Sequence, residues 1–470
     1  MSLQRFLRPF FVACVLTIVS MAARSAETPA PRPNVVLILC DNLGYGDVGC
    51  YGSTLHRTPH IDRLAREGVR FTDAYAASGV CTPSRAALMT GCYPRRVNLH
   101  VSDTGRVLQP VASKGLNPSE QTIADVLKSS GYATACIGKW HLGDQPELLP
   151  TRQGFDRYFG IPYSDDMTPR AGKSWPPLPL MEDERVIEAP VDVRTITQRY
   201  TEAAIEFLRN QRDGPFFLYL AHATPGSTRA PEVGDAFRGD SQNGPWGDSV
   251  EEIDASTGEI MRSLAELGLD QSTLVIWTND NGAPRRQPPQ GSNAPLSGWG
   301  YSTSEGGMRV PLIARWPQRV PAGEVCSEVV TLMDLLPTLA KLAGAELSQD
   351  RIIDGKEISP LLLGEPSAQS PHEAFYYYEG PRLEAVRSGK WKLYLATDKA
   401  DEPRLFDLRA DLAEAQELAA QHPDVVRQLI EYAEAARIEL GDGERRGTGQ
   451  RPAGFVENPT PRVLNPGRKD

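Results

Sequence analysis

Histidine is scarce in this sequence, with seven among 470 residues, and the seven are scattered along the chain. Clustered histidines are typical ligands of zinc, so the composition does not favour a zinc enzyme. Lysine and arginine are outnumbered by aspartate and glutamate, 50 to 60, which gives a formal net charge of −10. That balance argues against a nucleic-acid partner, and an anionic substrate would need a local cluster of basic residues.

Cysteines are too few for a domain held together by disulfides. Six of them lie beyond residue 26: Cys40, Cys50, Cys81, Cys92, Cys136 and Cys326. If one of the six is chemically modified, an odd number is left, and an odd number does not fit a disulfide framework.

Long apolar runs are missing after the N-terminus, and no later run reaches the roughly 20 residues that a membrane-spanning helix needs. At the N-terminus itself, Arg5 and Arg8 precede an apolar stretch at residues 9–19, and small residues follow at 22–26. This order is typical of a secretory signal peptide. We assign residues 1–26 to a cleaved signal peptide and expect a secreted or periplasmic protein.

Four apolar segments predict buried strands, and each runs directly into polar residues. They are residues 34–39, 132–138, 215–221 and 273–278. Continuous Val/Ile/Leu runs suit a sheet that is covered on both faces. Helical segments alternate with them at residues 58–67, 119–130, 195–212 and 249–267. The alternation predicts an α/β fold with a large mixed, mostly parallel, doubly wound sheet and helices on both faces.

The roughly 440 residues after the signal are too many for one small core, so two domains are expected. We assign residues 27–365 to a catalytic domain and residues 372–440 to a smaller C-terminal domain of antiparallel sheet and helix. Residues 441–470 are rich in Gly, Pro and Arg, and we expect a tail that wraps loosely or is disordered.

The stretch Cys81-Thr82-Pro83-Ser84-Arg85 predicts a reactive site at the start of a helix. Pro83 suits a first helical turn, because its ring fixes a helical φ. Cys81 would then lie where free N–H groups and the helix dipole favour anions. Arg85 would lie one turn further along, where its guanidinium can bind an oxyanion. The pattern indicates a nucleophile placed on an anion site.

Oxygen ligands for a metal follow two of the predicted strands. Asp41 and Asn42 come after the first, and Asp280 and Asn281 come after the fourth. Carboxylate and amide oxygens suit a hard cation such as Ca²⁺ or Mg²⁺. Each pair alone is also typical of a turn. Because both pairs lie at strand ends of one sheet, where ligands gather, the metal interpretation is favoured.

The pentapeptide at residues 81–85 resembles the sulfatase signature Cys-x-Pro-Ser-Arg, in which the cysteine is converted to formylglycine. Further segments are similar to sulfatase motifs in the same order: 33–47, 58–65, 138–143, 160–164, 280–282 and 305–311. Residues 237–260 are most similar to arylsulfatase A and N-acetylgalactosamine-6-sulfatase. The chain thus resembles the formylglycine-dependent sulfatases of the alkaline phosphatase superfamily over most of its length.

The resemblance implies a site and a reaction. Asp41, Asn42, Asp280 and Asn281 would bind Ca²⁺, and a formylglycine-generating enzyme would act transiently on Cys81. The hydrated aldehyde and the sulfate would be held by Arg85, Lys139, His141 and Ser164. The reaction would be hydrolysis of a sulfate ester, in a sulfated sugar or an aryl sulfate, to an alcohol and inorganic sulfate.

Three departures from the family pattern stand out. Asn42 occupies the second position of a usual Asp-Asp pair, which removes one ligand charge. The family's histidine near residues 225–226 is missing, and Gly300 stands where relatives have a lysine. In relatives that histidine and lysine contact the sulfate and help the leaving oxygen depart. His222 is the nearest substitute and is predicted to contact the substrate, with Arg229, Arg285 and Arg286 as further candidates; alternatively, His222 lies inside the fold.

Two other classes of function share this superfamily fold. A phosphatase or phosphonate hydrolase would mostly carry Ser or Thr as nucleophile and a His-rich zinc site. A non-catalytic, calcium-bearing glycan-binding relative would explain the missing histidine and lysine. Cys81, Arg85, Lys139 and His141 are all intact, which favours the sulfatase interpretation.

Overall fold

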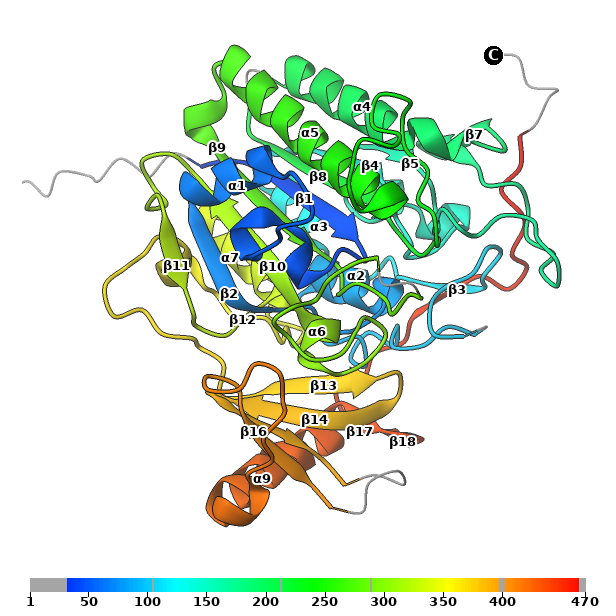
Figure 1. Cartoon of the computed structure of the whole chain (residues 1–470). Helices are drawn as coiled ribbons and strands as arrows, with labels where there is room; N and C mark the ends of the chain where they lie inside the picture. Colours follow the sequence, from blue (N-terminus) through cyan, green and yellow to red (C-terminus); the bar gives the residue numbers. More distant parts are fainter. Residues whose placement is uncertain (1–31, 104, 212–213, 288–289, 397–401, 465–470) are drawn as a thin grey trace, which may run out of the picture. The chain divides into compact units, whose positions relative to one another are not determined.

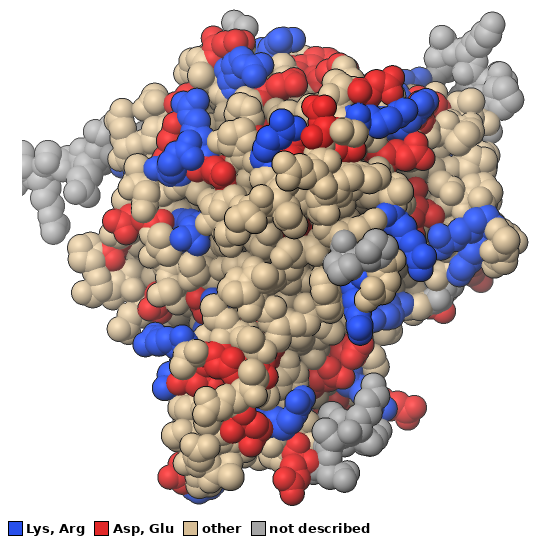
Figure 2. All heavy atoms as spheres, in the orientation of Figure 1, with Lys and Arg blue, Asp and Glu red and all other residues tan. Residues whose placement is uncertain are grey.

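A computed structural model describes residues 32–464 except 104, 212–213, 288–289 and 397–401. The predicted signal peptide at residues 1–26 lies outside these described residues. Within them, no helix combines the length and the apolar character needed to cross a membrane. On the face drawn in Figure 2, acidic and basic side chains are interspersed over most of the surface, and several basic side chains gather at its right.

One large mixed sheet forms the centre of the fold (Figure 1). Its strand order is β11-β2-β10-β9-β1-β8-β4-β5-β6-β7, and β12 pairs with β2. The inner strands are β1 (Asn34–Asp41), β4 (Ala133–Gly138), β8 (Phe216–Pro225) and β9 (Thr273–Asn279). The other strands are β2 (Val69–Tyr75), β5 (Arg157–Gly160), β6 (Leu180–Glu182), β7 (Arg185–Glu188), β10 (Arg309–Arg315), β11 (Glu324–Cys326) and β12 (Val330–Thr331).

The four predicted strands are neighbours in this sheet, in the order β9-β1-β8-β4, and all of their pairings are parallel. Every residue of β1, β8 and β9 is buried. A parallel strand covered on both faces needs apolar side chains on both sides, which explains the continuous hydrophobic runs. Antiparallel pairings of β10 with β9 and β2 make the sheet mixed.

Helices cover both faces of the sheet. The helices α1 (Pro59–Arg66), α4 (Ile196–Asn210) and α5 (Gly244–Glu266) share a core with Val36 and Ile38 of β1. The helices α2 (Cys81–Thr90), α3 (Ile123–Ser129), α7 (Leu335–Ala343) and the short α8 (Ser359–Leu362) share the opposite core with Leu37 and Leu39. Because neighbouring strand residues point to opposite faces, β1 contributes to both cores. The predicted doubly wound α/β architecture is confirmed.

A smaller antiparallel sheet follows in the C-terminal part, as predicted. It consists of β13 (Phe375–Glu379), β14 (Arg382–Ser388), β15 (Trp391–Tyr394) and β16 (Arg404–Asp407), and α9 (Pro423–Glu439) packs on it (Figure 1). Its core also includes Tyr75 and Met308 of the larger part. The described residues from Arg32 onward form one compact unit, so the boundaries at 365 and 372 stay predictions.

The tail is not loose over its described length, which corrects the expectation for residues 441–470. It forms a hairpin of β17 (Gly441–Asp442) and β18 (Arg445–Arg446), and β19 (Gly454–Phe455) pairs with β3 (Lys114–Gly115). Arg451 also bonds to both carboxylate oxygens of Glu120, at 2.8 Å each. Specific backbone pairing and an ion pair fix this Gly- and Pro-rich segment, and composition alone could not reveal either.

A buried ionic cluster joins the small sheet to the loop before α6 (Glu305–Met308). The Lys392 ammonium on β15 lies 2.9 Å from carboxylate oxygens of both Glu305 and Glu414, and it donates to the Thr303 carbonyl at 2.9 Å. Burial disfavours the charged form of Glu305, but Lys392 and two arginines outweigh it and lower its pKa to about 2.

We therefore expect Lys392→Met to lower the free energy of unfolding by about 3 kcal/mol, because buried carboxylates lose their cation. The matched control is Lys390→Met, whose partly exposed ammonium pairs with Asp407. That change should cost less than about 1 kcal/mol. Urea unfolding at pH 7 measures both, and equal losses would contradict a structural role for the buried cluster.

Candidate active site

The polar residues that follow the four inner strands meet at one edge of the sheet. Leu39 of β1 pairs with Thr278 of β9 and with Ala221 of β8, and Ala221 pairs with Gly138 of β4. The carboxyl ends of these strands are therefore in register. This brings together the segments that begin at Asp41, Lys139 and Asp280, as the sequence predicted.

Cys81 is the first residue of α2 and lies against the two carboxylates. Its Sγ and one carboxylate oxygen each of Asp41 and Asp280 are all within 4.8 Å of one another. Burial and the Asp41 charge raise the pKa of the Cys81 thiol well above its ordinary value. The thiol of Cys81 is therefore held in its neutral form, although residue 81 lies beside the carboxylates of Asp41 and Asp280.

Two buried cations bracket the carboxylates. The Arg85 guanidinium donates from Nε to Asp280 Oδ2 at 2.9 Å and from Nη2 to Asp41 Oδ1 at 3.2 Å. Its Nη1 donates to the Lys139 carbonyl at 2.8 Å. The Lys139 ammonium donates to Asp41 Oδ1 at 2.6 Å and to Ser164 Oγ at 3.2 Å. Arg85, Lys139 and Ser164 thus meet in one network. That they hold the hydrated aldehyde and the sulfate stays a prediction.

Asp41 and Asp280 behave as a coupled pair. Burial disfavours ionisation of Asp41, but Lys139 and Arg85 outweigh it and hold its pKa well below the usual range. Burial and the Asp41 charge raise the pKa of Asp280 above its ordinary value. Two carboxylates this close repel each other, and a bound cation would relieve that repulsion.

The amide side chains complete an oxygen-rich set that fits a hard cation. Asn281 Oδ1 is buried and has no hydrogen-bond partner among the described residues. Asn281 Nδ2 donates to Asn42 Oδ1 at 2.5 Å, and the Asn42 backbone N–H donates to Asp280 Oδ1 at 3.1 Å. Asn42 has a φ of 61°, which asparagine tolerates better than most residues. The unpartnered buried oxygen of Asn281, the residue after Asp280, is therefore available as a ligand for a hard cation.

His141 is held with one ring nitrogen available. Its Nε2 donates to the Leu108 carbonyl at 2.9 Å, so Nδ1 carries the lone pair. Nδ1 is buried and has no partner among the described residues. Burial and the charges of Lys139 and Arg85 lower the pKa of His141 well below its ordinary value, which keeps the ring neutral. A neutral ring with a free acceptor can take a proton from a neighbouring hydroxyl.

The position of His222 does not support the predicted substrate contact. Its ring Nε2 lies 3.3 Å from Ser256 Oγ on α5, and the side chain is fully buried. The helix α5 covers the face of the sheet opposite to α2. Burial lowers the pKa of His222 to about 4. His222 is therefore part of the fold beneath α5, and we withdraw it as the substitute for the missing histidine.

The three departures from the family pattern are connected in space. Asn42 Nδ2 donates to Ser227 Oγ at 3.1 Å, and that oxygen lies 3.1 Å from the Tyr301 hydroxyl. Ser227 follows the position of the missing histidine, and Tyr301 follows Gly300. An aspartate at position 42 could not donate this bond. The sequence analysis missed Ser227 and Tyr301, because Tyr301 reaches the site through a φ of 68° that no local pattern predicts.

A pocket of about 550 Å³ lies beside this chain of hydrogen bonds. Its polar lining residues are Asp165, Asp166, Thr168, Arg170, Thr224, Ser227, Thr228, Arg229, Glu232 and Arg286. Ser227 belongs to both the pocket and the site, so the two are contiguous. Of the three arginines proposed as substitutes, Arg229 and Arg286 line this pocket, whereas Arg285 is exposed and is not among its lining residues.

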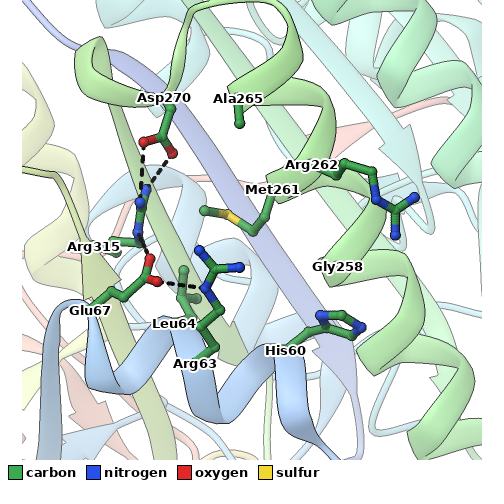
Figure 3. A pocket seen from close by; sticks show the side chains of 10 residues that line it. All are labelled: His60, Arg63, Leu64, Glu67, Gly258, Met261, Arg262, Ala265, Asp270 and Arg315. Atoms are coloured by element: carbon green, nitrogen blue, oxygen red, sulfur yellow. Dashed lines mark hydrogen bonds and ion pairs between the residues drawn. The ribbon is translucent and has the colours of Figure 1, made fainter.

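A second pocket, between α1 and α5, is separate from the site (Figure 3). Arg315 ends β10 beside Val275, near the amino end of β9, whereas Asp280 follows its carboxyl end. The basic group of Arg315 is already paired with Asp270 at 2.7 Å and with Glu67 at 2.8 Å. We assign no function to this pocket.

Comparison with known proteins gives a consistent result. A sulfatase family model matches residues 33–345, and a model described as N-sulphoglucosamine sulphohydrolase, C-terminal, matches residues 301–438. Human arylsulfatase A is 40% identical, and the match covers 87% of this chain and 88% of that protein. N-acetylgalactosamine-6-sulfatase from Canis lupus familiaris is 37% identical, covering 82% and 75%. The mouse steryl-sulfatase is 36% identical, covering 90% and 85%.

Solved structures agree with the sequence relatives. The PsFucS1 sulfatase from Pseudoalteromonas sp. superposes with a TM-score of 0.76 at 27% identity, and the match covers 86% of this chain and 89% of that one. The fold, the motif on α2 and these relatives define the protein as a sulfuric ester hydrolase. The chain belongs to the sulfatase family.

Proposed function

We propose that this enzyme hydrolyses its sulfate ester with a formylglycine derived from Cys81 and a calcium ion bound by Asp41, Asn42, Asp280 and Asn281. The observation that carries the proposal is the position of Cys81, at the start of α2 and within 4.8 Å of two buried carboxylates. Calcium would polarise the sulfate, and the hydrated aldehyde would supply a nucleophilic hydroxyl and a second hydroxyl for release.

The residues of the chain have distinct roles in this proposal. Arg85 and Lys139 are fixed by the two carboxylates and lie beside residue 81, where they stabilise oxygens that gain charge. The free N–H groups at the start of α2 add to that stabilisation. Ser164 positions the Lys139 ammonium. His141 accepts a proton at Nδ1 from the second hydroxyl, which allows sulfate to depart.

The remaining parts of the proposal concern partners and location. A formylglycine-generating enzyme would modify Cys81 transiently, before the buried site closes around it. Residues 1–26 would direct the chain to a secreted or periplasmic location. The substrate would be a sulfated glycan or another sulfated small molecule, and the net charge of −10 leaves nucleic acid as an unsuitable partner.

Paired assays with 4-nitrophenyl sulfate and 4-nitrophenyl phosphate test the function. We expect kcat/KM for the sulfate to exceed that for the phosphate by at least about 100-fold in the calcium-loaded enzyme, because differential stabilisation of the transition state sets such ratios. Arg85→Ala should lose the sulfate activity. A reversed preference would favour a phosphatase or phosphonate hydrolase. Calcium binding without turnover of either compound would favour a glycan-binding relative.

A phosphonate monoester hydrolase from Agrobacterium radiobacter superposes with a TM-score of 0.60 at 20% identity. That likeness concerns the fold alone, so the phosphonate alternative depends entirely on the assay.

A further inference from the structure

Asp165 packs closely against Gly226, the position at which the family's histidine is missing. Gly226 has a φ of 73° and lies at the end of the β8 loop, where relatives carry the histidine. A Cβ atom built on Gly226 would lie 2.8 Å from the Ala223 carbonyl oxygen and 3.0 Å from Asp165 Oδ1, so the Asp165 carboxyl and the backbone fill the place of a side chain here. The Asp165 carboxyl therefore lies against the position that the family uses to assist the leaving group.

Asp165 also connects the sulfate side of the site with the pocket. It follows Ser164, whose hydroxyl donates to Asp165 Oδ1 at 3.3 Å and accepts from Lys139 Nζ at 3.2 Å. Its side chain is part of the wall of the 550 Å³ pocket. The Asp165 carboxyl thus contacts both the Ser164 hydroxyl on the sulfate side and the pocket on the other side. The bond between sulfate and alcohol would lie between these two regions.

The surroundings of Asp165 are those of a carboxylic acid rather than of a carboxylate. The residue is 8% exposed, and none of the described residues forms an ion pair with it. Its neighbour Asp166 does have one, with Arg170 at 3.8 Å. A buried carboxyl without a counter-ion favours its protonated form.

We propose that Asp165 is the general acid of this enzyme: it protonates the departing alcohol, which occupies the pocket lined by Asp165, Ser227 and Arg286. The inference rests on the proposed sulfatase function and concerns the same site. In this enzyme the Asp165 carboxyl would assist departure of the ester oxygen, which a histidine and a lysine assist in relatives.

The proton donor suits the polar character of the pocket. Guanidinium and carboxylate groups dominate its wall, from Arg170, Arg229, Arg286, Asp166 and Glu232. Such groups pair with hydroxyls, so the pocket fits a sugar better than a flat apolar alcohol. A sugar alkoxide is a poor leaving group, and its departure therefore requires protonation.

The step balances without a further reactant. The nucleophilic hydroxyl at residue 81 first gives its proton to solvent. As its oxygen bonds to sulfur, the bond between sulfur and the ester oxygen breaks and its electron pair stays on that ester oxygen. The Asp165 carboxyl hydrogen moves to the same oxygen, which leaves a neutral alcohol and a carboxylate. Water reprotonates the carboxylate after the alcohol departs.

Burial raises the pKa of Asp165 to about 7, and the charges of Asp166 and Asp41 add to the effect, while Lys139 opposes it. The titratable and charged groups around Asp165 are Asp41, Lys139, Asp166, Arg170, Tyr200, Arg229, Glu232 and Arg286. The acid is active in its protonated form. Rates with unactivated substrates should therefore fall as pH rises through about 7.

The test uses aryl sulfates of graded leaving-group acidity, from 4-nitrophenyl to phenyl to 4-methoxyphenyl sulfate. Asp165→Asn keeps the shape of the side chain but cannot supply the proton. We expect it to slow phenyl sulfate by about 10²–10⁴-fold, whereas 4-nitrophenyl sulfate, which needs no proton, changes by less than about tenfold. The matched control is Asp270→Asn, because Asp270 lies outside the site and pairs with Arg315 at 2.7 Å. It should affect all three substrates equally and little.

A second measurement needs no variant. In the wild-type enzyme, rates should depend weakly on leaving-group acidity below pH 7 and steeply above it. Parallel losses on all sulfates in Asp165→Asn, or a leaving-group dependence that is the same at every pH, would overturn the role of Asp165 and leave the sulfatase function intact. A wild-type enzyme that turns over none of the sulfates would overturn the proposed function, and this inference with it.

Discussion

Cys81→Ser is expected to abolish multiple turnover of sulfate esters, with a loss of at least about 10⁴-fold in the steady-state rate. A serine hydroxyl can attack sulfur once, but the resulting sulfate ester has no second hydroxyl to expel sulfate. The variant should therefore release about one equivalent of alcohol per site and then stop. Rapid-mixing measurements with 4-nitrophenyl sulfate report both the first turnover and the steady state.

Cys326→Ser is the matched control, because Cys326 is partly exposed on the edge strand β11. It should turn over at the wild-type rate. Full multiple turnover in Cys81→Ser would show that the modified side chain is not needed and would contradict the proposed chemistry.

Asp280→Ala is expected to remove both calcium and activity. Asp280 supplies carboxylate oxygens beside Asp41, and its Oδ2 also fixes Arg85 at 2.9 Å. Loss of a charged ligand weakens calcium binding. Even residues that only hydrogen-bond to a metal ligand change metal affinity by about 10–100-fold, so we expect the calcium dissociation constant to rise by at least about 100-fold. Metal analysis and calcium titration measure the binding, and 4-nitrophenyl sulfate measures the rate.

Asp270→Ala is the control for this change, because Asp270 pairs with Arg315 at the pocket between α1 and α5. It should keep its calcium and its activity. Stoichiometric zinc in the wild-type protein, or normal turnover by Asp280→Ala, would refute the calcium assignment.

The fold and the ends of its strands were predictable because their signals are local. β1, β8 and β9 carry continuous apolar runs, and the residue that ends each run is polar. In parallel sheets the carboxyl ends share one edge, so Asp41 and Asp280 could be placed together before any coordinates were known.

The face on which a side chain points was harder to predict. Where both faces of a strand are buried, the apolar run shows no alternation, so nothing distinguished the α2 side of β8 from the α5 side. His222 is the nearest substitute for the missing histidine in the sequence, but its bond to Ser256 on α5 shows that its ring points to the other face of the sheet.

The contacts that complete the site depend on loops that meet only in the folded chain. Asp165 and Gly226 are 61 residues apart in the sequence, and Ser227 meets Tyr301 across 74 residues. The close approach of Asp165 to Gly226 and the φ of 68° at Tyr301 have no signal in composition or periodicity. Only the arrangement in space shows that Asn42 and Tyr301 both bond to Ser227, which lines one pocket with Asp165.

The mass of the peptide that contains residue 81, measured on protein with proven turnover, tests the central claim most directly. The account predicts an aldehyde or its hydrate at position 81, which also reacts with a hydrazide probe, while the other five cysteines of residues 40–326 keep their thiols. Fully active enzyme whose residue-81 peptide carries only an unmodified thiol would contradict it.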